Sequence, residues 1–442
     1  MIRKILKLNS EILRKPTDVV TDFDFDFQIL IDDMIETMRK ANGIGLAAPQ
    51  VGISKKLIVL EFEGDKDSEL KSFPLTVLAN PKIVSSSKRK KNMVEGCLSF
   101  PGLEVLVKRP ANVTVKGQDR YGKPTTIKAT DLYARVVQHE IDHLNSTLLI
   151  DHIKETPVIF IGTGTLGVPS LQALIADPQY KVKLVITGNL KATSRSHKEK
   201  SINPIEQIAN SAKLPVLVTD SINSENVINR IKRAKPKLGI MADFGQIVGE
   251  QILAIPKYGV INIHPSLLPL HRGPSPIQET ILSGDKITGV TLILAVRKMD
   301  AGPIISQVSI RLSNSETSTI LKDYLGRLGA SLLLNSIPYY LAGDLEPVAQ
   351  DDAKATYTRL FQKNDGYVDQ NTSAEVVEKK VRAFDAWPKV FTKIKDMQIQ
   401  IVSAHFGENG EFVIDRVKPE GRNEMSYNDF VNGYRNTLTF KQ

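Results

Sequence analysis

The 442-residue sequence has a single cysteine, Cys97, and a single tryptophan. One cysteine excludes an internal disulfide framework, so this thiol can only be a ligand, a nucleophile or a packing group. No apolar run approaches the roughly 20 residues that cross a bilayer, and residues 1–9 lack the long apolar segment of a secretory signal. These absences predict a cytoplasmic protein without a membrane partner.

The remaining composition is that of a soluble chain with several domains. Apolar residues make up 41% of the sequence and charged residues 24%. The net charge of +9 favours an acidic partner such as RNA, but basic residues also serve solubility, and both interpretations stay open.

A metal-binding pattern lies at His139-Glu140-Ile141-Asp142-His143. Two histidines four residues apart on a helix lie on one face and can bind one metal ion. Cys97, in the segment EGCLS, can supply a thiolate. Three protein ligands leave a fourth position open, which is typical of a catalytic rather than a structural metal.

Upstream of this pattern, apolar periodicity predicts a helix over residues 27–38 that ends at Asn42-Gly43. The small residues of GIGLAAPQ, at 43–50, allow the backbone to pass close to a substrate and present the Gln50 amide from a proline-fixed turn. The basic run Lys88 to Lys91 is either a solvated hairpin tip or an RNA contact.

GIGLAAPQ, EGCLS and QHEIDHL, the last at 138–144, resemble the three motifs of the peptide deformylases in order and spacing, and the likeness covers about residues 2–153. It implies a metal, usually Fe²⁺ and replaceable by Zn²⁺, Ni²⁺ or Co²⁺, held by Cys97, His139 and His143. The substrates would be nascent formyl-methionyl peptides, with the ribosome as a potential place of encounter. The implied catalytic groups are the Glu140 carboxylate as proton carrier, the Gln50 side chain and Leu98 backbone N–H as oxyanion donors, and Gly45 in the pocket wall.

A glycine turn opens the second half of the chain. Residues 158–161 predict a strand, Gly162, Gly164 and Gly167 follow, and a helix begins near Leu171. The strand at 181–186 is not followed by the acidic residue that a dinucleotide ribose requires. We therefore interpret the segment as a turn of an open α/β sheet.

Asn262 and His264 alternate along a predicted strand that ends in a proline-bounded loop. They point the same way from the carboxyl end of the strand, where ligands of parallel sheets bind. Asp300, which follows the apolar run 290–296, is a candidate partner for the histidine. The alternative is a hydrogen-bonded core histidine beside an asparagine.

INIHPSLLP at 261–269, RGPSPIQ at 272–278, TGVTL at 288–292 and MDAGPII at 299–305 resemble the formyltetrahydrofolate-dependent formyltransferases. The resemblance implies that an amine attacks the formyl carbon of 10-formyltetrahydrofolate. Asn262 and protonated His264 would stabilise the oxyanion, and Asp300 would orient the imidazole. The implied folate contacts are Phe244, Gly245, Ser266, Leu267, Leu268 and Pro269.

Residues 381–388, VRAFDAWP, resemble the entry to the C-terminal domain of the methionyl-tRNA formyltransferases, which favours initiator methionyl-tRNA as the acceptor. That family inserts a basic loop at the acceptor stem, where this chain has Lys191, Arg195, Lys198 and Lys200. Such phosphate contacts would be sensitive to salt and blind to sequence. A merely solvated loop is the alternative.

We therefore predict a bifunctional enzyme of N-formylmethionine metabolism. Its expected parts are an α+β deformylase at 1–155, an open, mostly parallel α/β formyltransferase sheet at 156–345, a linker at 346–365 and a short OB-like β-barrel at 366–442. One alternative joins the deformylase to an inactive RNA- or ribosome-docking module. Another gives the transferase a sugar or other small amine as acceptor.

Overall fold

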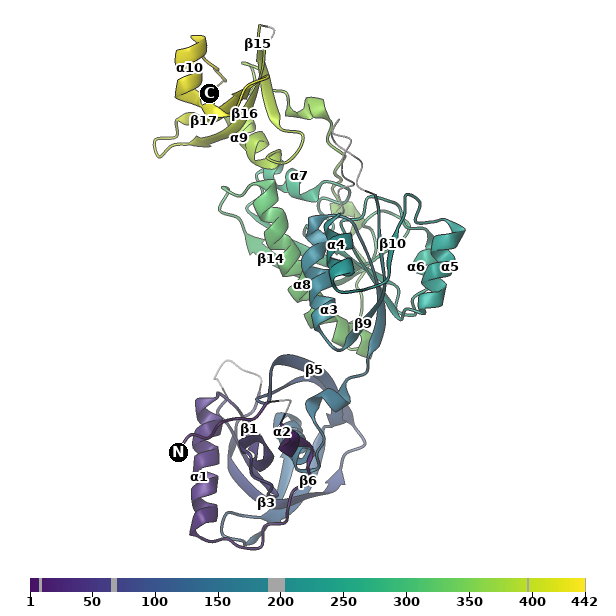
Figure 1. Cartoon of the computed structure of the whole chain (residues 1–442), viewed down its shortest axis with the longest axis vertical. Coiled ribbons are helices and arrows are strands. Elements are labelled where there is room, and N and C mark those ends of the chain that lie inside the picture. The colour runs from purple at the N-terminus through teal and green to yellow at the C-terminus, as the bar shows by residue number, and fades with distance from the viewer. Residues whose placement is uncertain (8–9, 65–69, 190–202, 396, 442) are drawn as a thin grey trace. The chain divides into compact units, whose positions relative to one another are not determined.

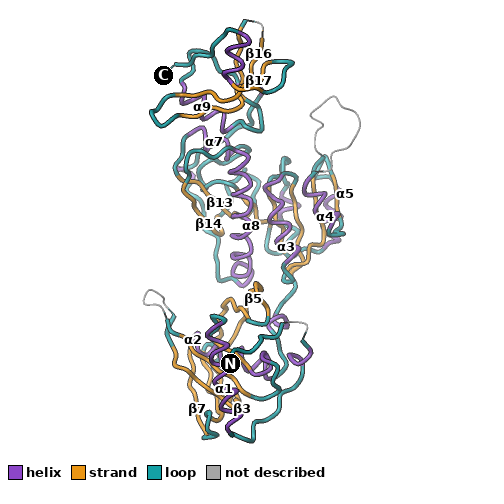
Figure 2. The backbone as a smooth tube through the Cα atoms, turned by 60° about the vertical axis from the view of Figure 1, so that its left-hand side comes forward, coloured by secondary structure: helices purple, strands orange, loops and turns teal. Residues whose placement is uncertain are grey.

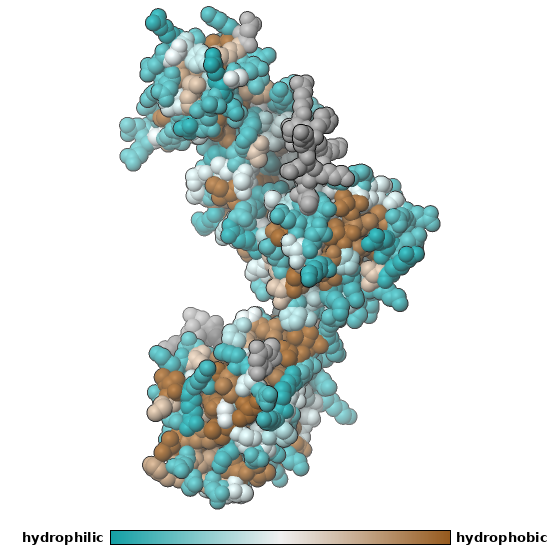
Figure 3. All heavy atoms as spheres, in the orientation of Figure 1, coloured by the Kyte–Doolittle hydropathy of each residue, from teal (hydrophilic) through white to brown (hydrophobic). Residues whose placement is uncertain are grey.

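The computed structural model describes residues 1–7, 10–64, 70–189, 203–395 and 397–441 (Figure 1). The chain forms two compact units, Met1–Lys154 and Glu155–Gln442. On the face drawn in Figure 3, both hydrophilic and hydrophobic residues are visible on each unit. Within the described ranges, no helix is both long and apolar enough to cross a membrane.

The first unit is built around an antiparallel sheet and two helices. The sheet has the order β1-β2-β3-β6-β7, and β4 and β5 form a separate hairpin. Helix α1 (Phe25–Lys40) begins where the Asp24 side chain accepts a hydrogen bond from the Phe27 N–H. The strands are β1 (Gly45–Ala47), β2 (Leu57–Phe62), β3 (Phe73–Ser86), β4 (Lys90–Cys97), β5 (Phe100–Pro110), β6 (Asn112–Gln118) and β7 (Pro124–Thr130).

Helix α2 (Asp131–Leu144) carries the histidine pair and lies against the core of this sheet. Ala134, Val137 and Ile141 pack with buried residues of β2, β3 and β6. This apolar face recurs every three or four residues, as expected of a helix lying on a sheet. The opposite side of α2 is therefore free to present the His139 and His143 rings to the β4–β5 hairpin.

The second unit contains a seven-stranded sheet of order β10-β9-β8-β11-β12-β13-β14. The five strands from β10 to β12 are parallel, and β13 pairs antiparallel with both β12 and β14. The predicted open, mostly parallel sheet is therefore confirmed. The strands are β8 (Thr156–Gly162), β9 (Tyr180–Thr187), β10 (Val216–Val218), β11 (Leu238–Ala242), β12 (Val260–His264), β13 (Ile287–Leu294) and β14 (Ile304–Arg311).

Helices cover both faces of this sheet. Apolar residues of α3, α4 and α8 share one buried cluster, and those of α5 and α6 share another. Figure 2 shows α8 beside β13 and β14. The helices are α3 (Val168–Ala176), α4 (Pro204–Ser211), α5 (Glu225–Ala234), α6 (Glu250–Leu253), α7 (Pro276–Ser283) and α8 (Ser318–Ala342).

The C-terminal part is a four-stranded antiparallel sheet of order β15-β16-β17-β18. In the part of the chain that is described, β15 and β18 pair with one neighbour each, so the sheet is open and the predicted OB-like barrel is not confirmed. Helix α9 packs on β16. The elements are α9 (Ala374–Ala383), β15 (Val390–Ile394), β16 (Met397–Phe406), β17 (Phe412–Pro419), β18 (Met425–Ser426) and α10 (Tyr427–Tyr434).

Candidate active sites

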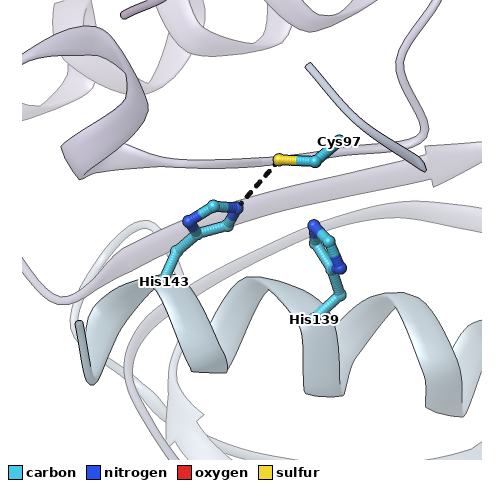
Figure 4. A group of neighbouring side chains, drawn as sticks. All are labelled: Cys97, His139 and His143. Atoms are coloured by element: carbon cyan, nitrogen blue, oxygen red, sulfur yellow. Dashed lines mark hydrogen bonds between the residues drawn. The ribbon is translucent and has the colours of Figure 1, made fainter. Parts of the chain in front are cut away.

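Three predicted ligands meet between α2 and the end of β4. The rings of His139 and His143 lie one helical turn apart and face Cys97 (Figure 4). One ligand atom from each residue lies within 4.8 Å of the other two. The Cys97 Sγ is 3.3 Å from the His143 Nε2. A thiolate and two imidazoles at this spacing fit a divalent metal such as Fe²⁺ or Zn²⁺.

Glu95 contacts one of the two histidines of this cluster. Its Oε2 lies 3.0 Å from the His139 Nδ1, which leaves the His139 Nε2 for a metal. Burial alone would raise the pKa of Glu95, but hydrogen bonds from His139 and Arg109 outweigh it and hold the pKa well below its usual range. Glu95 is thus an anion that fixes the ring orientation of His139.

Two buried arginines balance the charge of Glu95. Arg109 donates from Nε and Nη2 to its two carboxylate oxygens at 2.7 and 2.9 Å. Arg135 donates to Oε1 at 2.5 Å and to the Val107 carbonyl at 2.8 Å. Since both guanidinium groups are buried, the β4–β5 hairpin and α2 are joined by a desolvated ion network.

Glu140 is buried beside the cluster. Burial raises its pKa to about 7, and the nearby His139 partly opposes this. Its Oε2 has no hydrogen-bond partner within the described residues. A Cβ at Gly45 would stand 2.4 Å from the Glu140 Oε1, so only glycine leaves room for the carboxylate.

The Gln50 side chain also faces Cys97. Its Oε1 accepts a hydrogen bond from the Ala47 N–H at 2.8 Å. This contact turns the Nε2 toward the Ser99 Oγ at 3.2 Å and the Cys97 Sγ at 3.6 Å. Leu98 lies between these two residues in the chain, and its carbonyl accepts a hydrogen bond from Lys7.

The second candidate site lies at the carboxyl end of β12. The Asn262 Nδ2 donates to the Asp300 Oδ1 at 3.1 Å. The His264 Nδ1 lies 3.6 Å from the same oxygen, and its Nε2 lies 3.1 Å from the His271 carbonyl oxygen. The structure thus brings the three predicted residues together, with an acceptor facing each nitrogen of the buried imidazole.

Three family models match the chain in succession: polypeptide deformylase over residues 2–157, formyl transferase over 156–337 and the formyl transferase C-terminal domain over 361–411. The methionyl-tRNA formyltransferases of Roseiflexus castenholzii and Bacillus velezensis are 33% and 31% identical to it. The alignments cover 63% of this chain in each case, and 96% and 95% of those proteins.

Solved peptide deformylases are similar to the first part. A peptide deformylase from Legionella pneumophila is 47% identical. The alignment covers 35% of this chain and 87% of the Legionella chain, with a TM-score of 0.32. A Met-Ala-Ser-bound deformylase from Acinetobacter baumannii is 32% identical, covering 35% and 99%, with a TM-score of 0.33.

The chain belongs to both the peptide deformylase and the methionyl-tRNA formyltransferase families. The prediction of a bifunctional enzyme of formyl-methionine metabolism is therefore confirmed. The deformylase family implies a divalent metal, and the formyltransferase family implies formyltetrahydrofolate and initiator tRNA.

In the formyltransferase, the predicted folate contacts come from two loops at the carboxyl edge of the sheet. Phe244 and Gly245 follow β11. Ser266 is fully buried, and its Oγ donates to the Leu270 carbonyl at 2.7 Å. The Leu268 N–H donates to Thr291 at 3.1 Å. Leu267 and Pro269 complete this second loop.

Asp243 packs against the glycine turn after β8. The N–H groups of Thr163 and Gly164 donate to the Asp243 carbonyl at 3.1 and 3.2 Å, and a Cβ at Gly164 would stand 1.8 Å from the Asp243 Oδ2. Such packing is consistent with a structural turn of the sheet. The predicted tRNA contacts Lys191, Arg195, Lys198 and Lys200 lie outside the described residues.

Sequence reasoning missed the groups that hold the predicted residues in place. In the deformylase these are Glu95, Arg109 and Arg135; Glu95 lies within the EGCLS motif, but nothing in the local pattern connects it to the arginines. In the formyltransferase, His271 pairs with Asp285 at 2.7 Å and places its own carbonyl against His264.

Proposed function

We propose that two separate sets of residues perform the two reactions, in domains at 1–155 and 156–345, with the linker and C-terminal domain at 346–365 and 366–442. Cys97, His139 and His143, with Glu140, would serve formyl hydrolysis. The observation that carries this assignment is the convergence of these three ligands beside a buried carboxylate, one oxygen of which has no hydrogen-bond partner among the described residues.

The metal would be held by the Cys97 Sγ and one nitrogen of each histidine. When bound, it supplies a Lewis acid and lowers the pKa of water at its open position. One thiolate and two imidazoles can hold Fe²⁺, Zn²⁺, Ni²⁺ or Co²⁺, and the resemblance to the deformylases favours Fe²⁺.

Glu140 would move the proton of the deformylase reaction. A carboxyl group with a pKa of about 7 can accept a proton from the attacking water and return it to the departing amine at neutral pH. The Gln50 Nε2 and the Leu98 N–H would donate to the oxyanion that forms from the formyl group. Gly45 keeps the space that the carboxylate occupies.

In formyl transfer, the amine of the acceptor would attack the formyl carbon of 10-formyltetrahydrofolate. Asn262 and protonated His264 would donate to the developing oxyanion, and Asp300 would hold the imidazole. The C–N bond to the folate then breaks, the folate nitrogen takes a proton, and the acceptor amine loses one. The loops at 244–245 and 266–269 would border the folate.

The acceptor would be initiator methionyl-tRNA, supported by the methionyl-tRNA formyltransferases at up to 36% identity. Lys191, Arg195, Lys198 and Lys200 would contact its phosphates, in which case affinity falls steeply with salt. Nascent formyl-methionyl peptides would be the deformylase substrates. A sugar or small-amine acceptor predicts a salt-insensitive KM instead.

The test is formylation of initiator methionyl-tRNA by the full chain with 10-formyltetrahydrofolate, in a Glu140→Ala background that prevents hydrolysis. Product that disappears with His264→Ala supports the assignment. Folate binding without any tRNA formylation would refute the acceptor, and tRNA binding without folate dependence would favour the docking-module alternative.

A further inference from the structure

Residues 346–358 run from the end of α8 toward the C-terminal sheet and contact two segments near the candidate transferase site, the loop after β12 and the start of β14. Backbone bridges join Val348 to Ile304 and Tyr357 to Arg272. The first bridge lies at the start of β14, just beyond Asp300, and the second lies in the loop after β12. We call residues 346–358 the crossing segment.

Arg272 is completely buried and depends on the crossing segment for its polar contacts. Its Nε and Nη2 donate to the Gln350 Oε1 at 3.0 and 2.8 Å. Nη2 also donates to Asp352 at 2.7 Å, and Nη1 to the Tyr357 hydroxyl at 3.3 Å. A buried guanidinium without such partners would be strongly destabilising, so these contacts fix Gln350 beside Arg272.

The other end of the Gln350 amide binds the loop of the candidate catalytic aspartate. Its Nε2 donates to the Asp300 carbonyl at 2.8 Å and to the Gly302 carbonyl at 2.7 Å. The amide can take only this orientation, because a flip would set its NH₂ against the Arg272 donors and its oxygen against two carbonyl oxygens. All four hydrogen bonds are lost together if Gln350 is removed.

Asp300 needs such a restraint. Its φ is +49°, in the left-handed region that costs free energy for any residue with a Cβ. Its carboxylate accepts from the Asn262 side chain and from the Gly273 N–H at 2.9 Å. These side-chain contacts require the backbone of Asp300 to stay in one place, and Gln350 holds its carbonyl oxygen.

We propose that Gln350 is a positioning residue for formyl transfer, which holds Asp300 in the geometry that orients His264. The inference rests on the proposed roles of Asp300 and His264. Gln350 acts through the Asp300 backbone and touches neither the catalytic side chains nor, by this proposal, the substrates. The crossing segment therefore supports the active site, although it follows the last strand of the catalytic sheet.

The test compares steady-state formylation of methionyl-tRNA by the full chain and by Gln350→Ala. Because misplacement of a catalytic group by about 1 Å can cost 10²-fold, we expect kcat to fall about 10- to 100-fold. The KM values for tRNA and folate should stay within about 3-fold. Gln350→Glu keeps the Arg272 contact but sets a carboxylate oxygen against two carbonyls, so it should lose activity as well.

Asp351→Ala is the matched control. Asp351 neighbours Gln350, accepts a hydrogen bond from the Ala353 N–H and pairs with Lys354. Its formylation kcat should equal that of the parent. Thermal unfolding of each preparation identifies any variant that merely unfolds.

A double-mutant cycle with Asp300→Asn separates positioning from general destabilisation. If Gln350 acts through Asp300, Gln350→Ala should reduce the residual rate of Asp300→Asn by less than about 3-fold, because the two losses are not additive. Fully additive losses, or a Gln350→Ala kcat within 2-fold of the parent, would overturn the proposal. A parent enzyme without His264-dependent product would instead refute the proposed function itself.

Discussion

Two buried glutamates explain how the candidate deformylase site can work at neutral pH. Glu140 has no hydrogen-bond partner for Oε2 in the described structure, and its burial raises its pKa to about 7. Glu95 lies 45 residues earlier in the chain but close enough to Glu140 to affect its pKa, and it stays ionised because His139 and Arg109 donate to it. Two glutamates of one pocket thus differ in charge, as a proton carrier and a fixed anion require.

Glu140→Gln should remove proton transfer and leave the metal ligands intact. We expect deformylase kcat to fall about 10²- to 10⁴-fold, while formyl transfer by the same preparation is unchanged. Hydrolysis of a formyl-methionyl peptide and the metal content of the variant are the measurements. Loss of metal together with activity would contradict this role.

Gly45→Ala should also impair the deformylase, because the added Cβ would overlap the Glu140 carboxylate. We expect a loss of at least about 10-fold in kcat/KM, in line with misplacement of a catalytic group. Gly433→Ala, where no atom of the described residues lies within 4 Å of the new Cβ, should leave hydrolysis unchanged. Equal activity of both variants would show that the pocket can relax.

At the scale of helices and strands, local sequence patterns predicted which side chains lie on the same face of an element. The four-residue spacing of His139 and His143 indicated one face of a helix, and the alternation of Asn262 and His264 indicated one face of a strand. The contacts of β4 and β5 with α2 depend on pairing across long sequence distances, which no local pattern contains. Likewise, alternation predicted strands in the C-terminal part but could not show that their sheet stays open.

The network that joins the β4–β5 hairpin to α2 should be essential for the stability of the first unit. Arg109→Met would leave Glu95 buried with one partner fewer, so we expect a loss of about 3–5 kcal/mol. This loss of stability can be measured by urea unfolding of the full chain, monitored with a probe in the first unit. The exposed neighbour Lys108→Met should change stability by less than about 0.5 kcal/mol.

At the scale of the whole molecule, we predict that the two proposed reactions differ in their dependence on a metal. Within the described parts of the chain, the only cluster of at least three potential metal ligands is that of Cys97, His139 and His143. A chelator should therefore abolish deformylation and leave formyl transfer at its original rate. Added Fe²⁺, Zn²⁺, Ni²⁺ or Co²⁺ should restore hydrolysis alone; a parallel loss of transfer would contradict this separation.

The only cysteine of the chain is also the sulfur of the deformylase cluster. An oxidant that converts Cys97 to a sulfenic acid would find no second thiol in the chain to capture it as a disulfide, so further oxidation to the irreversible sulfinic acid stays open. The candidate transferase residues Asn262, His264 and Asp300 contain no sulfur. Oxidative stress would therefore inactivate deformylation before it affects formyl transfer.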